Sequence, residues 1–355
     1  MPNLNQKSPV FACAATAFGF RSLFPEIFCP DKFDRAYILK GSCGSGKSTA
    51  IRRIAEECDR RGEKYCLYAC SFDPSSFDGI VLTDRRIYIA DGTSPHATDP
   101  LYPGAVETVI DMSEGLDNAG ISEHREQIIS LCRKSRDSFS RAYSFLRAAY
   151  EMERNIEKIS SENFRTAKMQ AAAGRLSRDF IPRGSGHTKK RCLTQVYCKD
   201  GAYKSSAFFD GAQMKCLVTD KNGTGHLFME QMLHEAARKE QPAVISLSPL
   251  DFETVNALYL PEISMAFCIT DKADKQDGIF RIINMARFTD EASLAASKQK
   301  LRFMKKCFAE LTDGACECLA HAYESHSELE KLYCSQTDYS SNDTVIRRLT
   351  DEIFT

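Results

Sequence analysis

This chain of 355 residues contains no run of apolar residues that approaches a membrane-spanning length. A helix that crosses a bilayer needs about 20 mostly apolar residues, so the sequence predicts no such segment. The first residues, MPNLNQK, also lack the basic start and apolar core of a secretory signal peptide. We therefore expect a cytoplasmic protein without a membrane partner.

The chain also carries almost no net charge, because 47 basic and 48 acidic residues give −1 at pH 7. A near-neutral chain has no overall electrostatic attraction to nucleic acid. Basic residues do recur at helical spacing in one later segment, at Arg165, Lys168, Arg175 and Arg178. Because such a face is more often simply solvated, we do not expect a nucleic-acid partner.

Paired cysteine motifs are absent as well. None of the fifteen cysteines forms a C-x-x-C pair, and the nearest patterns are Cys66-x-x-x-Cys70 and Cys316-x-Cys318. Structural zinc sites usually show tighter paired spacing. Without a secretory signal, the sequence favours reduced, buried thiols over a metal site or a disulfide framework.

What the sequence does contain is a segment with the spacing G-x-x-x-x-G-K-[ST], the pattern of a phosphate-binding loop, or P-loop. Its glycines let the backbone turn so that successive N–H groups face a triphosphate. Lys47 is predicted to reach the β- and γ-phosphates, and the Ser48 hydroxyl to coordinate Mg²⁺. The predicted nucleotide-binding residues are Gly41, Ser42, Cys43, Gly44, Ser45, Gly46, Lys47, Ser48 and Thr49.

The flanks of this segment predict a strand before it and a helix after it. Residues 36–40 form a short apolar run, and Ile51, Ile54, Ala55 and Cys58 recur at the spacing of one helical face. A strand, a glycine loop and a helix N-terminus together make an anion site, because unpaired N–H groups and the helix dipole both face the ligand. These flanks argue against a glycine-rich turn that matches the motif by chance.

The second half of the chain repeats the first. Several matches in the same order indicate a duplicated unit with small insertions. The matching segments are 71–74 with 246–249, Asp91 with Asp271, Ile110 with Ile283, 146–151 with 319–324, and Glu157 with Glu330.

The copy of the glycine segment in the second half lacks the residues predicted to bind phosphate and magnesium. Residues 220–227 keep Gly223 and Gly225, but Asp220 replaces the first glycine, His226 the lysine and Leu227 the serine. A carboxylate at the phosphate position and a leucine at the magnesium position predict a unit that keeps the fold without nucleotide binding. The alternative is weak binding of a different ligand.

These patterns predict an α/β chain of two tandem P-loop NTPase-like units, each with a parallel-rich sheet covered by helices on both faces. We place the first unit at residues 1–183 and the degenerate repeat at 184–355, joined by the proline- and glycine-rich stretch 181–191. Strands are expected at 11–16, 36–40, 65–70, 79–82 and 87–90. Each unit should also carry a long helical region, which in the first forms an antiparallel pair over 122–180 that breaks near 160–163.

Two aspartates are candidates for the catalytic chemistry. Asp91 follows the apolar run 87–90, where a P-loop enzyme holds magnesium on an acidic residue, although its match with Asp271 would also suit a structural role. Asp73 follows the preceding strand and could position water, orient an acceptor or cap a turn. Its alignment with Ser248 means that it vanishes together with the lysine, which favours a functional role.

A histidine and two arginines are weaker candidates. His96, in a loop rich in turn formers, could be a general base, a phosphate contact or an ordinary hydrogen-bonded loop residue. Arg85 or Arg86 could act as an arginine finger, but their position between two short strands favours the simpler interpretation, a polar hairpin tip.

Four stretches resemble a bacterial family of two-repeat P-loop ATPases, common in Firmicutes: 18–24, 36–49, 91–96 and 102–107. The resemblance covers nearly the whole chain and is strongest from Phe18 to Met112. It implies ATP binding and a P-loop fold, but no particular substrate. In that family the second repeat often retains its own loop, so the changes at Asp220, His226 and Leu227 count against a two-nucleotide mechanism here.

The leading hypothesis is Mg²⁺-dependent ATP hydrolysis at a single site, with Lys47, Asp91 and Asp73 as catalytic residues and Ser48 and Asp91 as metal ligands. One alternative is a small-molecule phosphotransferase that uses the same loop. Another is a nucleotide-gated module that hydrolyses little and docks a protein partner on its helical regions.

Overall fold

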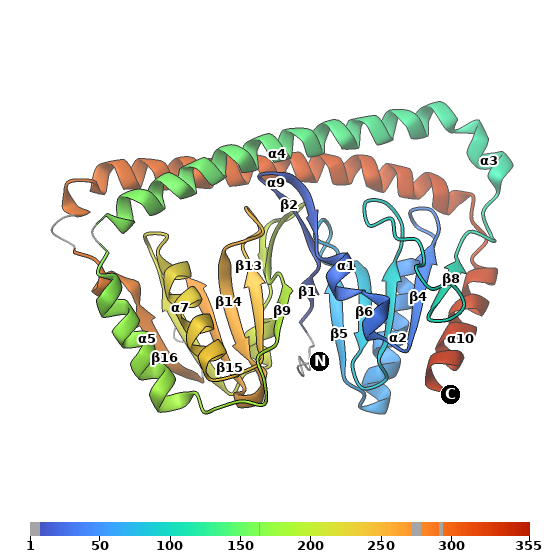
Figure 1. Ribbon diagram of the computed structural model, residues 1–355. Helices are drawn as coiled ribbons and strands as arrows, with labels where there is room; N and C mark the ends of the chain where they lie inside the picture. Colours follow the sequence, from blue (N-terminus) through green and yellow to red (C-terminus); the bar gives the residue numbers. More distant parts are fainter. Residues whose placement is uncertain (1–7, 163, 272–277, 291–293) are drawn as a thin grey trace.

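The computed structural model describes residues 8–162, 164–271, 278–290 and 294–355. Figure 1 shows two α/β bodies side by side, with the long helices α4 (Arg125–Ser161) and α9 (Lys298–Ser335) running across both. No helix in these ranges has the length and apolarity that a bilayer crossing requires.

The first body contains a six-stranded sheet in the order β1-β5-β6-β7-β4-β8, in which only β6 runs against the others. Its strands are β1 (Val10–Phe11), β4 (Arg35–Lys40), β5 (Tyr65–Ala69), β6 (Phe77–Leu82), β7 (Ile87–Asp91) and β8 (Glu107–Asp111). The same half contains the hairpin β2 (Cys13–Thr16) and β3 (Gly19–Ser22), and the helices α1 (Phe24–Ile27), η1 (Pro30–Lys32), α2 (Lys47–Arg61) and α3 (Asn118–Glu123).

The second body repeats this layout strand for strand. Its order, β9-β13-β14-β15-β12-β16, matches the first sheet, and again one strand, β14, is antiparallel. The strands are β9 (Lys189–Cys192), β12 (Met214–Thr219), β13 (Ala243–Leu247), β14 (Val255–Leu260), β15 (Met265–Thr270) and β16 (Ile279–Asn284). The remaining elements are the hairpin β10 (Gln195–Cys198) and β11 (Gly201–Lys204), and α6 (Ala207–Asp210), α7 (Gly225–Arg238), η2 (Pro261–Ile263) and η3 (Met285–Phe288). The prediction of two similar, parallel-rich α/β units is therefore confirmed.

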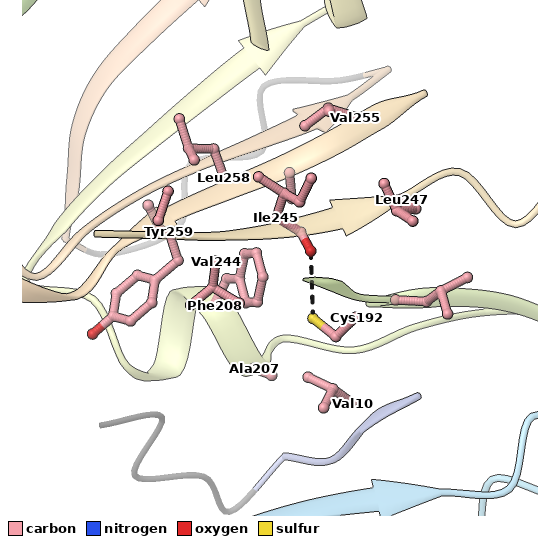
Figure 2. Packing of buried hydrophobic residues seen from close by; sticks show 14 of the residues in the cluster. Val10, Cys192, Ala207, Phe208, Val244, Ile245, Leu247, Val255, Leu258 and Tyr259 are labelled. Atoms are coloured by element: carbon pink, nitrogen blue, oxygen red, sulfur yellow. Dashed lines mark hydrogen bonds between the residues drawn. The ribbon is translucent and has the colours of Figure 1, made fainter. Parts of the chain in front are cut away.

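The two sheets meet at the edge strands β1 and β9. The Phe11 and Leu193 backbones exchange N–H···O bonds of 2.9 Å in both directions. One hydrophobic core continues across this junction, and Figure 2 shows Val10 of the first body facing Cys192 and Ala207 of the second. Beyond them Phe208 of α6 packs on the second sheet beside Val244 and Tyr259.

The two halves exchange their last helices. Helix α5 (Thr166–Phe180), from the first half, buries Met169, Ala173 and Leu176 in the core against α7 of the second body. Helix α10 (Ser340–Phe354), from the second half, buries Ile353 and its neighbours with α2 on the first sheet. Each sheet is thus completed by a helix from the other half, which the long helices α4 and α9 carry across.

The helical region differs from the predicted antiparallel pair within 122–180. Helix α4 runs to Ser161 and packs along its whole length on α9, burying Leu146 against Leu319, while α5 leaves for the other body. The expected break near 160–163 is observed, with position 163 outside the described residues. The apolar face of α4 is covered by α9, the matching helix of the repeat. It is therefore not available to α5, and α4 and α5 do not form the expected pair.

Two strand predictions also change. The run 11–16 is not one strand, because it turns at Ala12 and β2 leaves the sheet to pair with β3. Strand β8, at the far edge beside β4, was not predicted, because its exposed positions at Thr108 and Val109 break the apolar pattern of a buried strand.

Candidate functional site

The glycine loop, residues 41–49, follows β4, and its last three residues form the first turn of α2, as the sequence predicts. Gly44 and Gly46 have φ angles of 73° and 89°, in the left-handed region that glycine tolerates and other residues rarely adopt. Gly46 is the N-cap of α2 and has no capping side chain. The helix therefore presents its first N–H groups to the loop, where an anion can accept from them.

The Lys47 side chain folds back into this loop. Its Nζ donates to the carbonyl oxygens of Gly41 at 3.1 Å and Ser42 at 2.8 Å, and lies 3.8 Å from Asp91 Oδ2. The lysine is only 8% exposed. The structure therefore brings together Lys47 and Asp91, which the sequence predicted to share one site although they are far apart along the chain.

Asp91 ends β7 beside β4, and Ser48 lies in the first turn of α2. Asp91 Oδ1 accepts from the Thr93 N–H at 2.8 Å and from its hydroxyl at 2.6 Å, which leaves Oδ2 directed at Lys47. The Ser48 hydroxyl accepts from the Phe77 N–H at 3.0 Å. Both residues offer oxygen atoms near the glycine loop, where Mg²⁺ prefers such ligands.

The strand register corrects the expected partner of Asp91 in the second half. Gly79 pairs with Ala90 in the first sheet and Ala257 pairs with Cys268 in the second, so the counterpart of Asp91 is Ile269 rather than Asp271. The carboxylate is therefore absent from the degenerate unit, as the lysine is. This removes the argument that a purely structural aspartate persists in both halves.

The same register reverses the argument for Asp73. Its counterpart is Asp251 and not Ser248, because the Cys70 N–H bonds to Ser76 O just as the Ser248 N–H bonds to Thr254 O. Both aspartates close a turn by accepting a backbone N–H two residues later, at 3.2 Å for Asp73 and 2.9 Å for Asp251. A turn-forming role therefore accounts for Asp73 in both halves.

Residues from the second half cover the glycine loop, which the sequence did not predict. The Tyr339 hydroxyl donates to Gly44 O at 2.9 Å, and the Asn342 amide donates to Ser45 O at 2.9 Å. Helix α9 also ends on the loop, because a Cβ at Gly44 would lie 2.6 Å from Cys334 Sγ. The site is thus assembled from both halves of the chain.

Two titratable side chains at the covered glycine loop, Cys43 and His326, are uncharged near neutral pH. Burial raises the pKa of the Cys43 thiol to about 12, and Glu330 adds to the shift, so this loop cysteine is not a thiolate near neutral pH. Burial lowers the pKa of His326 on α9, a histidine that also senses the charges of Lys47 and Asp73. His326 is therefore an unprotonated imidazole near the site at neutral pH.

The degenerate loop binds a carboxylate of its own. Asp220 Oδ2 accepts from the Gly225 N–H at 2.6 Å, and its Oδ1 accepts from the Asn222 N–H at 2.9 Å. These amides are in the positions that would serve a phosphate, so the aspartate takes the place of the anion. His226, in the lysine position, lies 3.1 Å from Glu157 at the end of α4.

The remaining candidates lie elsewhere. Arg85 pairs with Glu63 at 2.7 Å and donates to Ile353 O at 2.8 Å, and Arg86 pairs with Asp34 at 2.9 Å. Both arginines precede β7, at the end of the sheet opposite the glycine loop, so neither is placed as an arginine finger within this chain. The His96 side chain is buried, and its polar partners are Cys13 and Asp78 rather than residues of the glycine loop.

The fit of α9 on the glycine loop can be tested with a matched pair of substitutions. Gly44 and Gly223 have φ angles of 73° and 74°, so alanine at either position meets the same backbone strain, about 1–2 kcal/mol. Only at Gly44 would the new methyl group collide with α9, since the nearest atom at Gly223 is 3.7 Å away. We expect Gly44→Ala to lower the free energy of unfolding clearly more than Gly223→Ala, as measured by urea denaturation. Equal losses would contradict the packing of α9 on the loop.

The chain was also compared with known proteins. No family model, curated protein or solved structure matches it. The resemblance to two-repeat P-loop ATPases therefore stays a prediction, and the functional argument depends on the site itself.

Proposed function

We propose that this protein binds ATP at the glycine loop of its first half and hydrolyses it with Mg²⁺. The observation that carries the proposal is the meeting of Lys47 and Asp91, 3.8 Å apart, at the N-terminus of α2. A lysine on a glycine loop and an acidic residue at the end of the adjacent strand are what phosphate and magnesium binding require.

In this proposal the loop amides and the α2 N-terminus hold the phosphates. Lys47 exchanges the carbonyls of Gly41 and Ser42 for β- and γ-phosphate oxygens, which accept a stronger, charge-assisted hydrogen bond. Ser48 and Asp91 would hold Mg²⁺, which neutralises charge on the phosphates. Water attacks the γ-phosphorus in line, the bond to the β–γ bridging oxygen breaks, and ADP and phosphate leave.

The protein then acts by positioning and by charge stabilisation. His326 is a better candidate than Asp73 for orienting the water, because it is unprotonated and Asp73 already closes a turn and lies 3.7 Å from Lys199. A small-molecule phosphotransferase, the alternative in which an acceptor replaces water, would use the same loop.

A nucleotide-gated binding module is the second candidate. It is favoured by the bonds from Tyr339 and Asn342 to the loop carbonyls of Gly44 and Ser45. These bonds tie α10, and the short connection between α9 and α10, to the phosphate site. Nucleotide that reorients these carbonyls would loosen or tighten the two helices, and so change a surface available to a protein partner.

Phosphate release tests the catalytic form of the proposal. We expect Mg²⁺-dependent phosphate release from ATP, reduced in Asp91→Asn by at least about 10–100-fold, since the loss of a residue that merely orients a metal ligand already costs that much. Asp111→Asn is the matched control, since Asp111 ends β8, on the other side of β4 from β7, and accepts the Ser113 N–H at 2.8 Å in a similar turn. Binding without turnover in the native chain would instead favour the gated module, and phosphate found on an added acceptor would favour the phosphotransferase.

A further inference from the structure

Three side chains with metal-binding atoms converge in a buried cluster apart from the glycine loop. Cys13 begins β2, Asp78 lies on β6, and His96 lies in the loop after β7. The distances are 3.3 Å from His96 Nε2 to Asp78 Oδ2, 3.9 Å from Cys13 Sγ to His96 Nε2, and 3.8 Å from Cys13 Sγ to Asp78 Oδ2.

This arrangement differs from a catalytic cysteine–histidine–aspartate triad. In a triad the base bonds to the nucleophile through one ring nitrogen and to the carboxylate through the other. Here the thiol and the carboxylate both address His96 Nε2, while His96 Nδ1 is buried and makes no hydrogen bond to the described residues. The three groups therefore point at one common position instead of forming a relay.

The spacing of the three atoms matches a tetrahedral metal site. With usual zinc–sulfur, zinc–nitrogen and zinc–oxygen bond lengths, ligand atoms of a tetrahedron are about 3.3–3.6 Å apart. The observed edges of 3.3, 3.8 and 3.9 Å need contractions of only a few tenths of an ångström. Ser71, whose hydroxyl lies 3.4 Å from Cys13 Sγ, is placed to supply or orient the fourth ligand.

Charge and burial favour the same occupant. Cys13, Asp78 and Ser71 are 1%, 6% and 6% exposed. A thiolate, a carboxylate and a neutral imidazole sum to −2, so a divalent cation makes the buried group neutral overall, which avoids an uncompensated buried charge. Phe24 stacks on the His96 ring, with centroids 4.2 Å apart and planes 7° apart, which fixes the plane of the imidazole.

We propose that Cys13, Asp78 and His96 bind a divalent transition-metal ion of the zinc class. Thiolate and imidazole ligands select zinc over magnesium or calcium, which prefer oxygen. The ion would join the β2–β3 hairpin, strand β6 and the loop that follows Asp91, and so hold that loop in place beside the glycine loop. The proposal does not depend on nucleotide binding.

Metal analysis of the purified full-length chain tests the proposal. We expect about one equivalent of zinc after dialysis against metal-free buffer, lost in Cys13→Ala and in His96→Gln, as follows from one site with these ligands. Cys216→Ala is the matched control, because Cys216 is an equally buried thiol on β12 of the other sheet. Retention of zinc by all three variants would place the metal elsewhere and overturn the assignment.

Cobalt replacement gives a readout that needs no variant. Co²⁺ added to the metal-free native chain should produce a thiolate charge-transfer band in the near ultraviolet together with the intense visible bands of a tetrahedral site. A chain that binds no zinc and gives neither set of bands would overturn the proposal, and the cluster would then be a hydrogen-bonded aspartate–histidine pair beside a thiol.

Discussion

Lys47→Ala is expected to weaken Mg-ATP binding roughly ten- to a hundredfold, because a hydrogen bond to a charged group contributes about 1.5–3 kcal/mol. In the native chain the Lys47 amino group contacts two loop carbonyls and Asp91. Among the described residues it has no further polar partner that the substitution would leave unpaired. Isothermal titration calorimetry of the native and variant chains measures the change directly.

His226→Ala supplies the matched control, since His226 stands at the equivalent position of the degenerate loop. There the Asp220 carboxylate already accepts the loop amides of Asn222 and Gly225, so nucleotide binding should be unchanged. If Lys47→Ala bound Mg-ATP as well as the native chain, the glycine loop would not be the phosphate site. If His226→Ala alone lost binding, the active loop would be that of the second half.

Ile353→Ala, only two residues from the end of the chain, is expected to destabilise the first body by about 2–5 kcal/mol, the usual loss for a large aliphatic side chain truncated in a core. Ile353 is fully buried with Ile51 and Ile54 of α2, although it belongs to the second half by sequence. Urea denaturation measures the loss, and Mg-ATP binding should weaken with it because α10 holds the cover of the glycine loop.

Arg348→Ala, on the exposed face of the same helix, is the control and should change stability little. Were α10 only a loosely attached tail, Ile353→Ala and Arg348→Ala would behave alike. Comparable small effects from both would therefore contradict the exchange of terminal helices between the two halves.

Much of this architecture was predictable from local patterns. The strand 36–40, the helix after Lys47 and the duplicated layout all follow from apolar spacing and repeated segments, which depend on residues close together in sequence. The exchange of α5 and α10 does not, because an amphipathic helix shows which of its faces is buried but not which sheet covers it. For the same reason no local signal indicated that Tyr339 and Asn342 reach the glycine loop.

Insertions made the sequence alignment of the two halves unreliable for single residues. Matching letters paired Asp91 with Asp271 and Asp73 with Ser248, whereas strand pairing gives Ile269 and Asp251. The register is fixed by hydrogen bonds between strands, and one shifted position reverses the inference about a residue.

The cluster of Cys13, Asp78 and His96 could not be predicted from the sequence, for a related reason. Cys13 and Asp78 are more than sixty positions apart in the sequence, so the cluster has no spacing motif. Only the folding of β2, β6 and the loop after β7 onto one end of the sheet brings the three side chains together.

The central claim is one nucleotide site per chain, built on the first glycine loop and closed by the second half. The number of Mg-ATP molecules bound per chain at saturation tests it most directly, by equilibrium dialysis or calorimetry of the native protein. We predict one. Two bound nucleotides would show that the loop with Asp220 is also competent, and none would show that the glycine loop with Lys47 and Asp91 does not bind ATP.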